Sequence, residues 1–174
     1  MKNVKDYVIS IPDFPKEGII FRDVTGVTEN AEGFHLAIEA LDAQLDGVDY
    51  DIIAGTESRG FIFGAPLAYK NNKGLVLVRK KGKLPRETIE RSYDLEYGSA
   101  TIEIHKDAIK PGMRVVLVDD LIATGGTIEA AAKLIEELGG EVVKMIFLIE
   151  LTDLGGRKLL EGYDIASVIQ YEGE

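Results

Sequence analysis

Short apolar runs alternate along this chain with segments of helical periodicity, and this alternation constrains the fold more than any other feature. Apolar runs of this length are predicted to be buried strands. They lie at 50–55, 74–79, 114–118, 141–151 and 163–171. Strands that alternate with amphipathic helices favour a mostly parallel sheet covered by helices on both faces. We therefore predict an α/β fold whose ligands bind beyond the carboxyl ends of the strands.

Three segments carry the helical pattern. Apolar residues recur at helical spacing from Phe34 to Leu45 and again from Ile128 to Leu138. Residues 61–71 are predicted to form a helix interrupted by Pro66, because proline removes a backbone N–H from a helix interior.

Two further segments fit neither pattern. Residues 99–105 alternate apolar and polar side chains, with Glu103 and His105 on the polar side. This alternation predicts a half-exposed strand that forms a hairpin or flap. Near the N-terminus, Pro12 and Pro15 predict an irregular segment.

The composition limits the kinds of site and of partner that this chain can have. The chain has no cysteine, which excludes disulfides, thiolate metal sites and cysteine nucleophiles, and it has only two histidines. Its formal net charge of −10 argues against a general nucleic-acid binder, which needs a basic face to neutralise phosphates. No apolar segment approaches the roughly 20 residues needed to cross a bilayer, and no signal peptide is visible. We therefore expect a cytoplasmic protein that binds neither nucleic acid nor membranes.

Residues 79–91, RKKGKLPRETIER, concentrate positive charge on this acidic chain. The cations are Arg79, Lys80, Lys81, Lys83, Arg86 and Arg91, against only Glu87 and Glu90. A local cationic stretch on an acidic protein favours the binding of a small anion. A solvated, lysine-rich loop is the alternative interpretation.

Residues 115–127, VVLVDDLIATGGT, contain a turn suited to a phosphate. A strand that leads through a glycine-rich turn into a helix presents backbone N–H groups and a partial positive charge. Thr124 and Thr127 add hydroxyl donors. Gly125 and Gly126 allow the backbone to approach a ligand closely.

The two carboxylates before this turn narrow the ligand further. Asp119 and Asp120 can hold vicinal hydroxyls, directly or through a hydrated Mg²⁺. The chain has neither a GxxxxGK[ST] nor a GxGxxG motif, so nucleotide triphosphatases and dinucleotide-binding enzymes are not favoured. A phosphorylated sugar offers hydroxyls and a phosphate at this separation. A solvated acidic pair on an ordinary strand-to-helix turn is the alternative.

The same stretch resembles the phosphoribosyl pyrophosphate signature of the type I phosphoribosyltransferases. Within that superfamily the chain is similar to the adenine phosphoribosyltransferases, through IPDFPKEGIIFRDVT, GTESRGFIFGAPLA, VRKKGKLPRETI, YDLEYGSATIEIHKDAI and IQYE. The resemblance covers nearly the whole chain. It implies one domain over 1–174 with the type I phosphoribosyltransferase fold, a small N-terminal hood of about residues 1–30, and a flexible catalytic loop at about residues 80–98.

The resemblance also implies a reaction. The 5-phosphoribosyl group of Mg²⁺-bound phosphoribosyl pyrophosphate would pass to N9 of adenine, giving AMP and pyrophosphate in purine salvage. The family's transition state resembles a ribosyl oxocarbenium ion, so positioning and charge stabilisation are expected to dominate catalysis. The family usually forms homodimers, and we expect one here.

The residues implied for phosphoribosyl pyrophosphate come from three segments. Asp119 and Asp120 would hold the ribose hydroxyls and the Mg²⁺, in part through water, while the following turn would wrap the 5-phosphate. The loop after 50–55 often carries a non-proline cis peptide in this family and would bind the pyrophosphate. The full expected set is Glu57, Ser58, Arg59, Arg79, Lys83, Asp119, Asp120, Ala123, Thr124, Gly125, Gly126 and Thr127.

The catalytic and adenine-binding residues are implied in the same way. Arg59, Glu96 and Tyr97 are expected near the reacting centre. The alternative is that Tyr97 only packs and Glu96 is a surface carboxylate. Adenine is expected to lie against Ile19, Ile20, Phe21 and Arg22, where Phe21 would stack and backbone groups would recognise the 6-amino edge.

Two other functions remain open at this point. A non-catalytic regulator on the same fold would sense the sugar pyrophosphate, although the LEYG segment and the net charge of −10 favour catalysis. A transferase for a 6-oxopurine or a pyrimidine would share the donor site, and only FRD and LEY argue against it.

Overall fold

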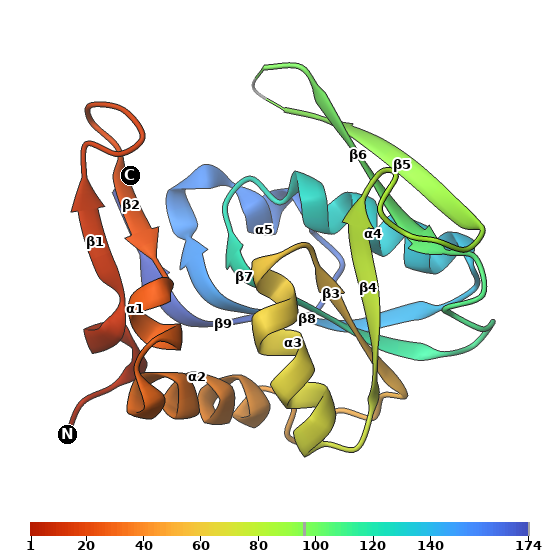
Figure 1. The fold of residues 1–174 in the computed structure, drawn as a ribbon, viewed down its shortest axis with the longest axis horizontal. Coiled ribbons are helices and arrows are strands. Elements are labelled where there is room, and N and C mark those ends of the chain that lie inside the picture. Colours follow the sequence, from red (N-terminus) through yellow and green to blue (C-terminus); the bar gives the residue numbers. More distant parts are fainter. Residues whose placement is uncertain (96, 174) are drawn as a thin grey trace.

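The structure, a computed structural model, describes residues 1–95 and 97–173. Its main feature is a seven-stranded sheet with the order β5-β6-β4-β3-β7-β8-β9 (Figure 1). The parallel strands are β3 (Ile52–Thr56), β4 (Gly74–Lys80), β7 (Arg114–Ile122), β8 (Glu141–Leu151) and β9 (Ile165–Tyr171). The mostly parallel sheet predicted from the sequence is confirmed.

Helices cover both faces of this sheet. On β7, Val116 and Val118 face a core shared with α2 (Ala31–Ala43) and α3 (Arg59–Lys70). The alternate residues Val115 and Leu117 face a second core shared with α4 (Gly126–Glu137). Because successive strand residues point to opposite faces, one apolar run fills both cores.

The second predicted helix is continuous rather than interrupted. α3 runs through Pro66, although that residue cannot donate a helical hydrogen bond. Phe63 and Leu67 are fully buried against the sheet. Their burial outweighs the one missing bond, and for this reason the predicted break at Pro66 is wrong.

The N-terminal segment is also more regular than predicted. After η1 (Val4–Tyr7), the strands β1 (Ile9–Pro12) and β2 (Ile20–Asp23) pair antiparallel, and α1 (Thr25–Thr28) follows. Pro12 is the last residue of β1, where a missing N–H costs little. Figure 1 shows this small hairpin beside the end of β9 rather than within the central sheet.

Much of the segment expected to be a loop at about 80–98 is a strand. β5 (Thr88–Asp94) pairs antiparallel with β6 (Ser99–His105), which confirms the hairpin predicted from the alternation at 99–105. Figure 1 shows this hairpin projecting from one edge of the sheet.

Two short elements, η2 (Thr152–Leu154) and α5 (Gly156–Leu159), connect β8 to β9. No helix within the described ranges is long and apolar enough to span a bilayer.

Candidate active site

A cavity of about 360 Å³ opens where β3, β4 and β7 reach their carboxyl ends. Ligands of open parallel sheets bind at this edge. The cavity is lined by Glu57, Ser58, Arg59, Lys80, Tyr93, Ile102, Asp119, Asp120, Leu121 and Thr127. Two sequence segments predicted to bind one ligand, the loop after β3 and the acidic pair, therefore meet in one place.

The acidic pair lies inside β7, which continues to Ile122. Asp120 is buried, and its backbone N–H donates to Asp119 Oδ1 over 2.8 Å. Burial and the charge of Asp120 raise the pKa of Asp119 well above its ordinary value. Two carboxylates held this close favour a cation, and oxygen ligands are those that Mg²⁺ prefers.

Arg59 supplies a positive charge to this pair. It is the first residue of α3 and follows a cis peptide bond between Glu57 and Ser58. Its Nε lies 2.5 Å from Asp120 Oδ2, while its side chain remains 52% exposed. The cis peptide that the family often carries is present, and Arg59 is held at the cavity by a carboxylate.

Glu57, expected to bind phosphoribosyl pyrophosphate, lines the cavity and pairs with two of the predicted cations. Its carboxylate, 9% exposed, lies 2.9 Å from Arg79 Nη2 and 3.2 Å from Lys83 Nζ. It also accepts a hydrogen bond from the Lys80 backbone N–H over 2.7 Å. Burial alone would raise the pKa of Glu57, but the Lys80 N–H and the two cations outweigh it, and the pKa lies below its ordinary value. Glu57 therefore holds the two predicted pyrophosphate cations beside the cavity.

The predicted phosphate turn forms a second, adjoining cavity of about 120 Å³. Every residue of Ala123–Thr127 lines it, together with Asp119. Gly125 has φ +88°, a conformation that favours glycine, and α4 begins at the next residue. The first N–H groups of α4 thus lie beside the acidic pair, as the sequence predicted.

The residues expected to bind adenine lie apart from both cavities. Ile19, Ile20, Phe21 and Arg22 belong to the N-terminal hairpin, and neither cavity counts them among the described residues that line it. The Phe21 ring packs edge to face on Phe14, with centroids 5.3 Å apart. The guanidinium of Arg22 lies 4.0 Å from the centroid of the Tyr171 ring.

Of the two predicted catalytic residues of the LEYG segment, Tyr97 does not line the cavity in the described part of the chain. Tyr97 is 83% exposed in the turn between β5 and β6. Glu96 lies outside the described residues. Instead, Tyr93 of β5 lines the cavity, and its hydroxyl accepts a hydrogen bond from Thr127 Oγ1 over 3.0 Å. Ile89 and Tyr93 are four residues apart and so lie on one face of a strand, and this spacing is the signal that could have identified Tyr93.

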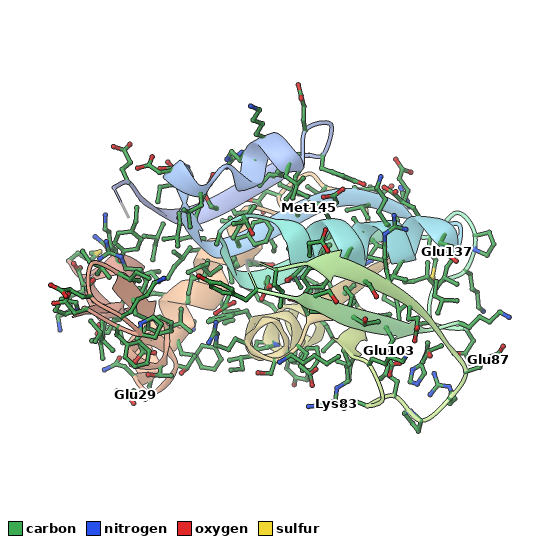
Figure 2. All side chains as sticks on the ribbon, turned by 90° about the horizontal axis from the view of Figure 1, so that it is seen from above. Glu29, Lys83, Glu87, Glu103, Glu137 and Met145 are labelled. Atoms are coloured by element: carbon green, nitrogen blue, oxygen red, sulfur yellow. The ribbon has the colours of Figure 1, made fainter. Side chains whose placement is uncertain are left out.

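Glu103 was predicted on the exposed side of a strand, and this is wrong because the side chain has backbone partners inside the fold. It is 4% exposed, and its Oε1 accepts from the N–H groups of Lys83 and Leu84 over 3.1 and 2.9 Å. Figure 2 labels Lys83 and Glu103. Burial would raise the pKa of Glu103, but the backbone N–H donors outweigh it and lower the pKa. Glu103 fixes the turn from which Lys83 reaches Glu57.

We expect Glu103→Gln to lower the free energy of unfolding at pH 7 by about 1–3 kcal/mol, because buried N–H donors lose a charged acceptor. Urea unfolding measures this. Since the folded-state pKa is lowered, the carboxylate's contribution is present above its unfolded pKa and is lost as pH falls through the folded value. Glu87→Gln is the matched control, because the Glu87 side chain is exposed and pairs with an exposed lysine. An equal loss in both variants would contradict the role of Glu103.

Comparisons with known proteins agree with this geometry. Residues 29–170 match the phosphoribosyl transferase domain family. The chain is 64% identical over 174 residues to the adenine phosphoribosyltransferase of Agathobacter rectalis, covering 100% of both proteins. It is 68% identical over 174 residues to that of Butyrivibrio fibrisolvens, covering 100% of this chain and 96% of the relative.

Solved structures give the same result. The adenine phosphoribosyltransferase of Thermoanaerobacter pseudethanolicus is 57% identical with a TM-score of 0.93, and the match covers 97% of this chain and 98% of the other. The Saccharomyces cerevisiae enzyme, solved with an imino-altritol bisphosphate and adenine, is 41% identical with a TM-score of 0.89, and the match covers 95% and 96%. With its acidic pair and phosphate turn at one sheet edge and this similarity along its whole length, the chain belongs to the adenine phosphoribosyltransferase family.

Proposed function

We propose that the cavity beside Asp119 and Asp120 binds phosphoribosyl pyrophosphate with Mg²⁺ and supports transfer of the 5-phosphoribosyl group to N9 of adenine. The products are AMP and pyrophosphate, as in purine salvage. One observation carries this proposal: an acidic pair adjoins a glycine-bearing helix N-terminus at the carboxyl edge of a parallel sheet.

The 5-phosphate occupies the turn Ala123–Thr127. The N–H groups at the start of α4 donate to its oxygens, and the helix dipole favours its negative charge. The ribose hydroxyls then lie at Asp119 and Asp120, whose oxygens accept from them.

The residues present also fit Mg²⁺. Burial and the charge of Asp120 raise the pKa of Asp119, so a cation bound between the two carboxylates would relieve their repulsion, although Arg59 already contacts Asp120. Mg²⁺ is usually held by one or two carboxylates together with waters and substrate phosphates. When bound, the ion neutralises charge on the departing pyrophosphate. Asp119 and Asp120 would hold it, directly or through water.

The cations predicted for pyrophosphate are already positioned by internal carboxylates. Glu57 holds Arg79 and Lys83, and Asp120 holds Arg59. An incoming pyrophosphate competes with these carboxylates for the three cations. Fixed cations that face the leaving group stabilise the charge that develops on it. In this proposal Arg59 is catalytic, and Glu57 and Ser58 form the wall of the pyrophosphate site.

Adenine binding and closure involve the two hairpins. We assign the base to Ile19, Ile20, Phe21 and Arg22; the yeast relative, solved with adenine, supports adenine as the base. The segment 80–98 closes over the ribose and brings Glu96 and Tyr97 to the reacting centre. Closure excludes water, which would otherwise capture an oxocarbenium-like centre.

We also propose that the chain forms a homodimer in the cytoplasm. On α3, Ile62 and Tyr69 are seven residues apart and so share one helix face, with exposures of 41% and 90%. An exposed apolar helix face of this kind suits a second copy of the chain. The mass of the protein in solution tests this assignment.

A base panel tests the transferase function. The purified protein is incubated with Mg²⁺, phosphoribosyl pyrophosphate and one of adenine, hypoxanthine, guanine or xanthine, and nucleotide formation is measured. We expect adenine to be strongly preferred, because each main-chain acceptor left unpaired by a 6-oxo purine costs about 1–3 kcal/mol. Preference for another base would refute the acceptor assignment. Binding of phosphoribosyl pyrophosphate without turnover of any base would favour the alternative function, a non-catalytic regulator that senses this sugar pyrophosphate.

A further inference from the structure

We propose, on the basis of the function proposed above, that Arg157 and Glu150 are positioning residues for the 5-phosphate turn Ala123–Thr127. Neither side chain lines the phosphate cavity within the described part of the chain. Their effect is exerted through the backbone of α5, which lies directly behind that turn.

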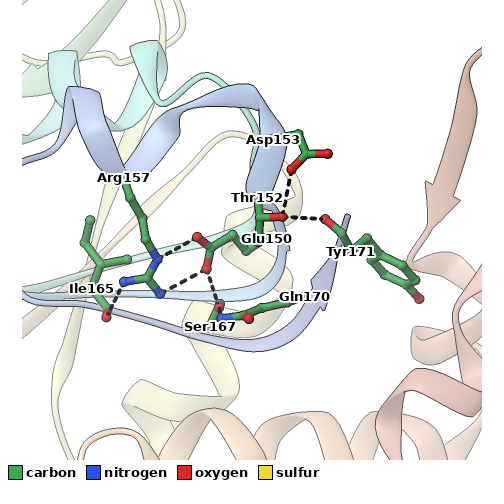
Figure 3. A network of polar contacts seen from close by, with 8 residues as sticks. All are labelled: Glu150, Thr152, Asp153, Arg157, Ile165, Ser167, Gln170 and Tyr171. Atoms are coloured by element: carbon green, nitrogen blue, oxygen red, sulfur yellow. Dashed lines mark hydrogen bonds and ion pairs between the residues drawn. The ribbon is translucent and has the colours of Figure 1, made fainter. Parts of the chain in front are cut away.

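The two side chains form a bidentate ion pair (Figure 3). Arg157 Nε lies 2.6 Å from Glu150 Oε1, and Arg157 Nη2 lies 3.0 Å from Oε2. Glu150 is 4% exposed and also accepts a hydrogen bond from Ser167 Oγ over 2.6 Å. A bidentate pair fixes direction as well as distance, which a single contact to lysine would not.

This ion pair fastens α5 to two strands at once. Glu150 lies near the end of β8, and Arg157 Nη1 also donates to the carbonyl oxygen of Ile165 at the start of β9 over 3.3 Å. Figure 3 shows the guanidinium between these two acceptors. The first turn of α5 therefore has a fixed place relative to the sheet.

The backbone of α5 is packed directly against the phosphate turn. A Cβ atom at Gly156 would lie 2.6 Å from the Ala123 carbonyl oxygen, closer than real Cβ contacts allow. A Cβ atom at Gly125 would lie 3.2 Å from the Gly156 carbonyl oxygen. With no space between the two backbones, a shift of α5 moves the turn that receives the phosphate.

Glu150, the acidic member of the ion pair, is connected to the same turn through the sheet. Glu150 is paired in register with Ile122, the last residue of β7 and the residue before Ala123. The ion pair between Arg157 and Glu150 thus connects β7, which leads into the turn, with α5, which packs behind it. Such support lets a binding loop hold its geometry before the ligand arrives.

The test compares Arg157→Met with Lys158→Met, a neighbouring exposed lysine on the same helix. Steady-state kinetics give kcat and the KM values for phosphoribosyl pyrophosphate and adenine, and calorimetry gives the Kd of ribose 5-phosphate. We expect Arg157→Met to raise the KM for the donor and the Kd by about tenfold or more, because small displacements of a binding group cost this much. The KM for adenine should stay unchanged, and Lys158→Met should match the unaltered protein. Arg157→Lys should fall between the two.

Thermal unfolding of each variant shows that it is folded at the assay temperature. If Arg157→Met does not fold, Arg157→Lys and Glu150→Gln carry the test. A folded variant with unchanged donor KM and ribose 5-phosphate Kd would overturn the inference, as would an equal rise in the KM for adenine. If the unaltered protein formed no AMP but bound ribose 5-phosphate, the transferase function would fail. Loss of that binding in Arg157→Met would still support the positioning role.

Discussion

Asp119→Asn is expected to remove most of the activity while raising the melting temperature of the ligand-free protein. The variant loses charge-assisted hydrogen bonds to the ribose hydroxyls, each worth about 1.5–3 kcal/mol. Loss of two such bonds predicts a fall in kcat/KM for phosphoribosyl pyrophosphate of about 100-fold or more. The carboxylate is also a proposed Mg²⁺ ligand, so the Mg²⁺ concentration needed for half-maximal activity should rise.

The gain in stability follows from the raised pKa of Asp119. Burial and the neighbouring charge of Asp120 make the ionised side chain costly in the folded state. This cost is absent below the unfolded pKa of about 3.9 and grows as pH rises toward the higher folded value. Asparagine removes the charge, so the difference between the variant and the unaltered protein should appear as pH rises above about 4.

Calorimetric melts across this pH range and steady-state kinetics measure both effects. Asp120→Asn is the matched control, because it also removes the repulsion but loses the 2.5 Å contact with Arg59. We expect it to reduce activity without raising the melting temperature. A lower melting temperature for Asp119→Asn would contradict the cost assigned to its charge. Activity close to that of the unaltered protein would contradict its role in donor binding.

The sequence predicted the central sheet because its strands are apolar runs separated by helical patterns. β8 matches the predicted range 141–151, and both faces are covered as the alternation required. Predictions from local residue preferences failed where tertiary packing decides the secondary structure. Pro66 sits inside a helix because its neighbours Phe63 and Leu67 are buried.

The candidate site was predicted in part. Asp119, Asp120 and the turn after them adjoin because they are consecutive in sequence at one strand end, and a local motif is sufficient to place them. Glu103 could not be placed in this way. Its partners, the N–H groups of Lys83 and Leu84, lie about 20 residues earlier, and only the pairing of β6 with β4 brings them together.

The sequence likewise could not predict which residues pair with the cations Arg79 and Lys83. Arg79 and Lys83 were predicted to meet pyrophosphate, and the structure adds that Glu57 holds them. The pairing of Glu57 with Arg79 and Lys83 leaves no periodic pattern in the sequence, because the two cations come from a neighbouring strand and the turn that follows it. The comparisons confirm the resemblance to the family. That resemblance predicted the members of this group but not their mutual contacts.

Gly125→Ala is expected to damage the phosphate turn in both stability and function. Gly125 has φ +88°, so alanine there should cost about 1–3 kcal/mol of backbone strain. The new Cβ would also lie 3.2 Å from the Gly156 carbonyl oxygen and 3.3 Å from its Cα, and both are backbone atoms with little room to move. The turn should therefore shift, and we expect the KM for phosphoribosyl pyrophosphate to rise by about tenfold or more.

Gly162→Ala is the control, because it introduces the backbone strain without the close contacts. Gly162 has φ +98°, but a Cβ there would meet nothing within 4 Å, and it lies in the turn before β9. Urea unfolding should therefore show a loss of stability in both variants, larger in Gly125→Ala because of the added contacts, whereas kinetics should show a raised donor KM only in Gly125→Ala. Equal KM values would mean that the turn tolerates the contact with α5. In that case the close packing between Gly125 and Gly156 would not position the phosphate, and the support assigned to Arg157 and Glu150 would lose its physical route.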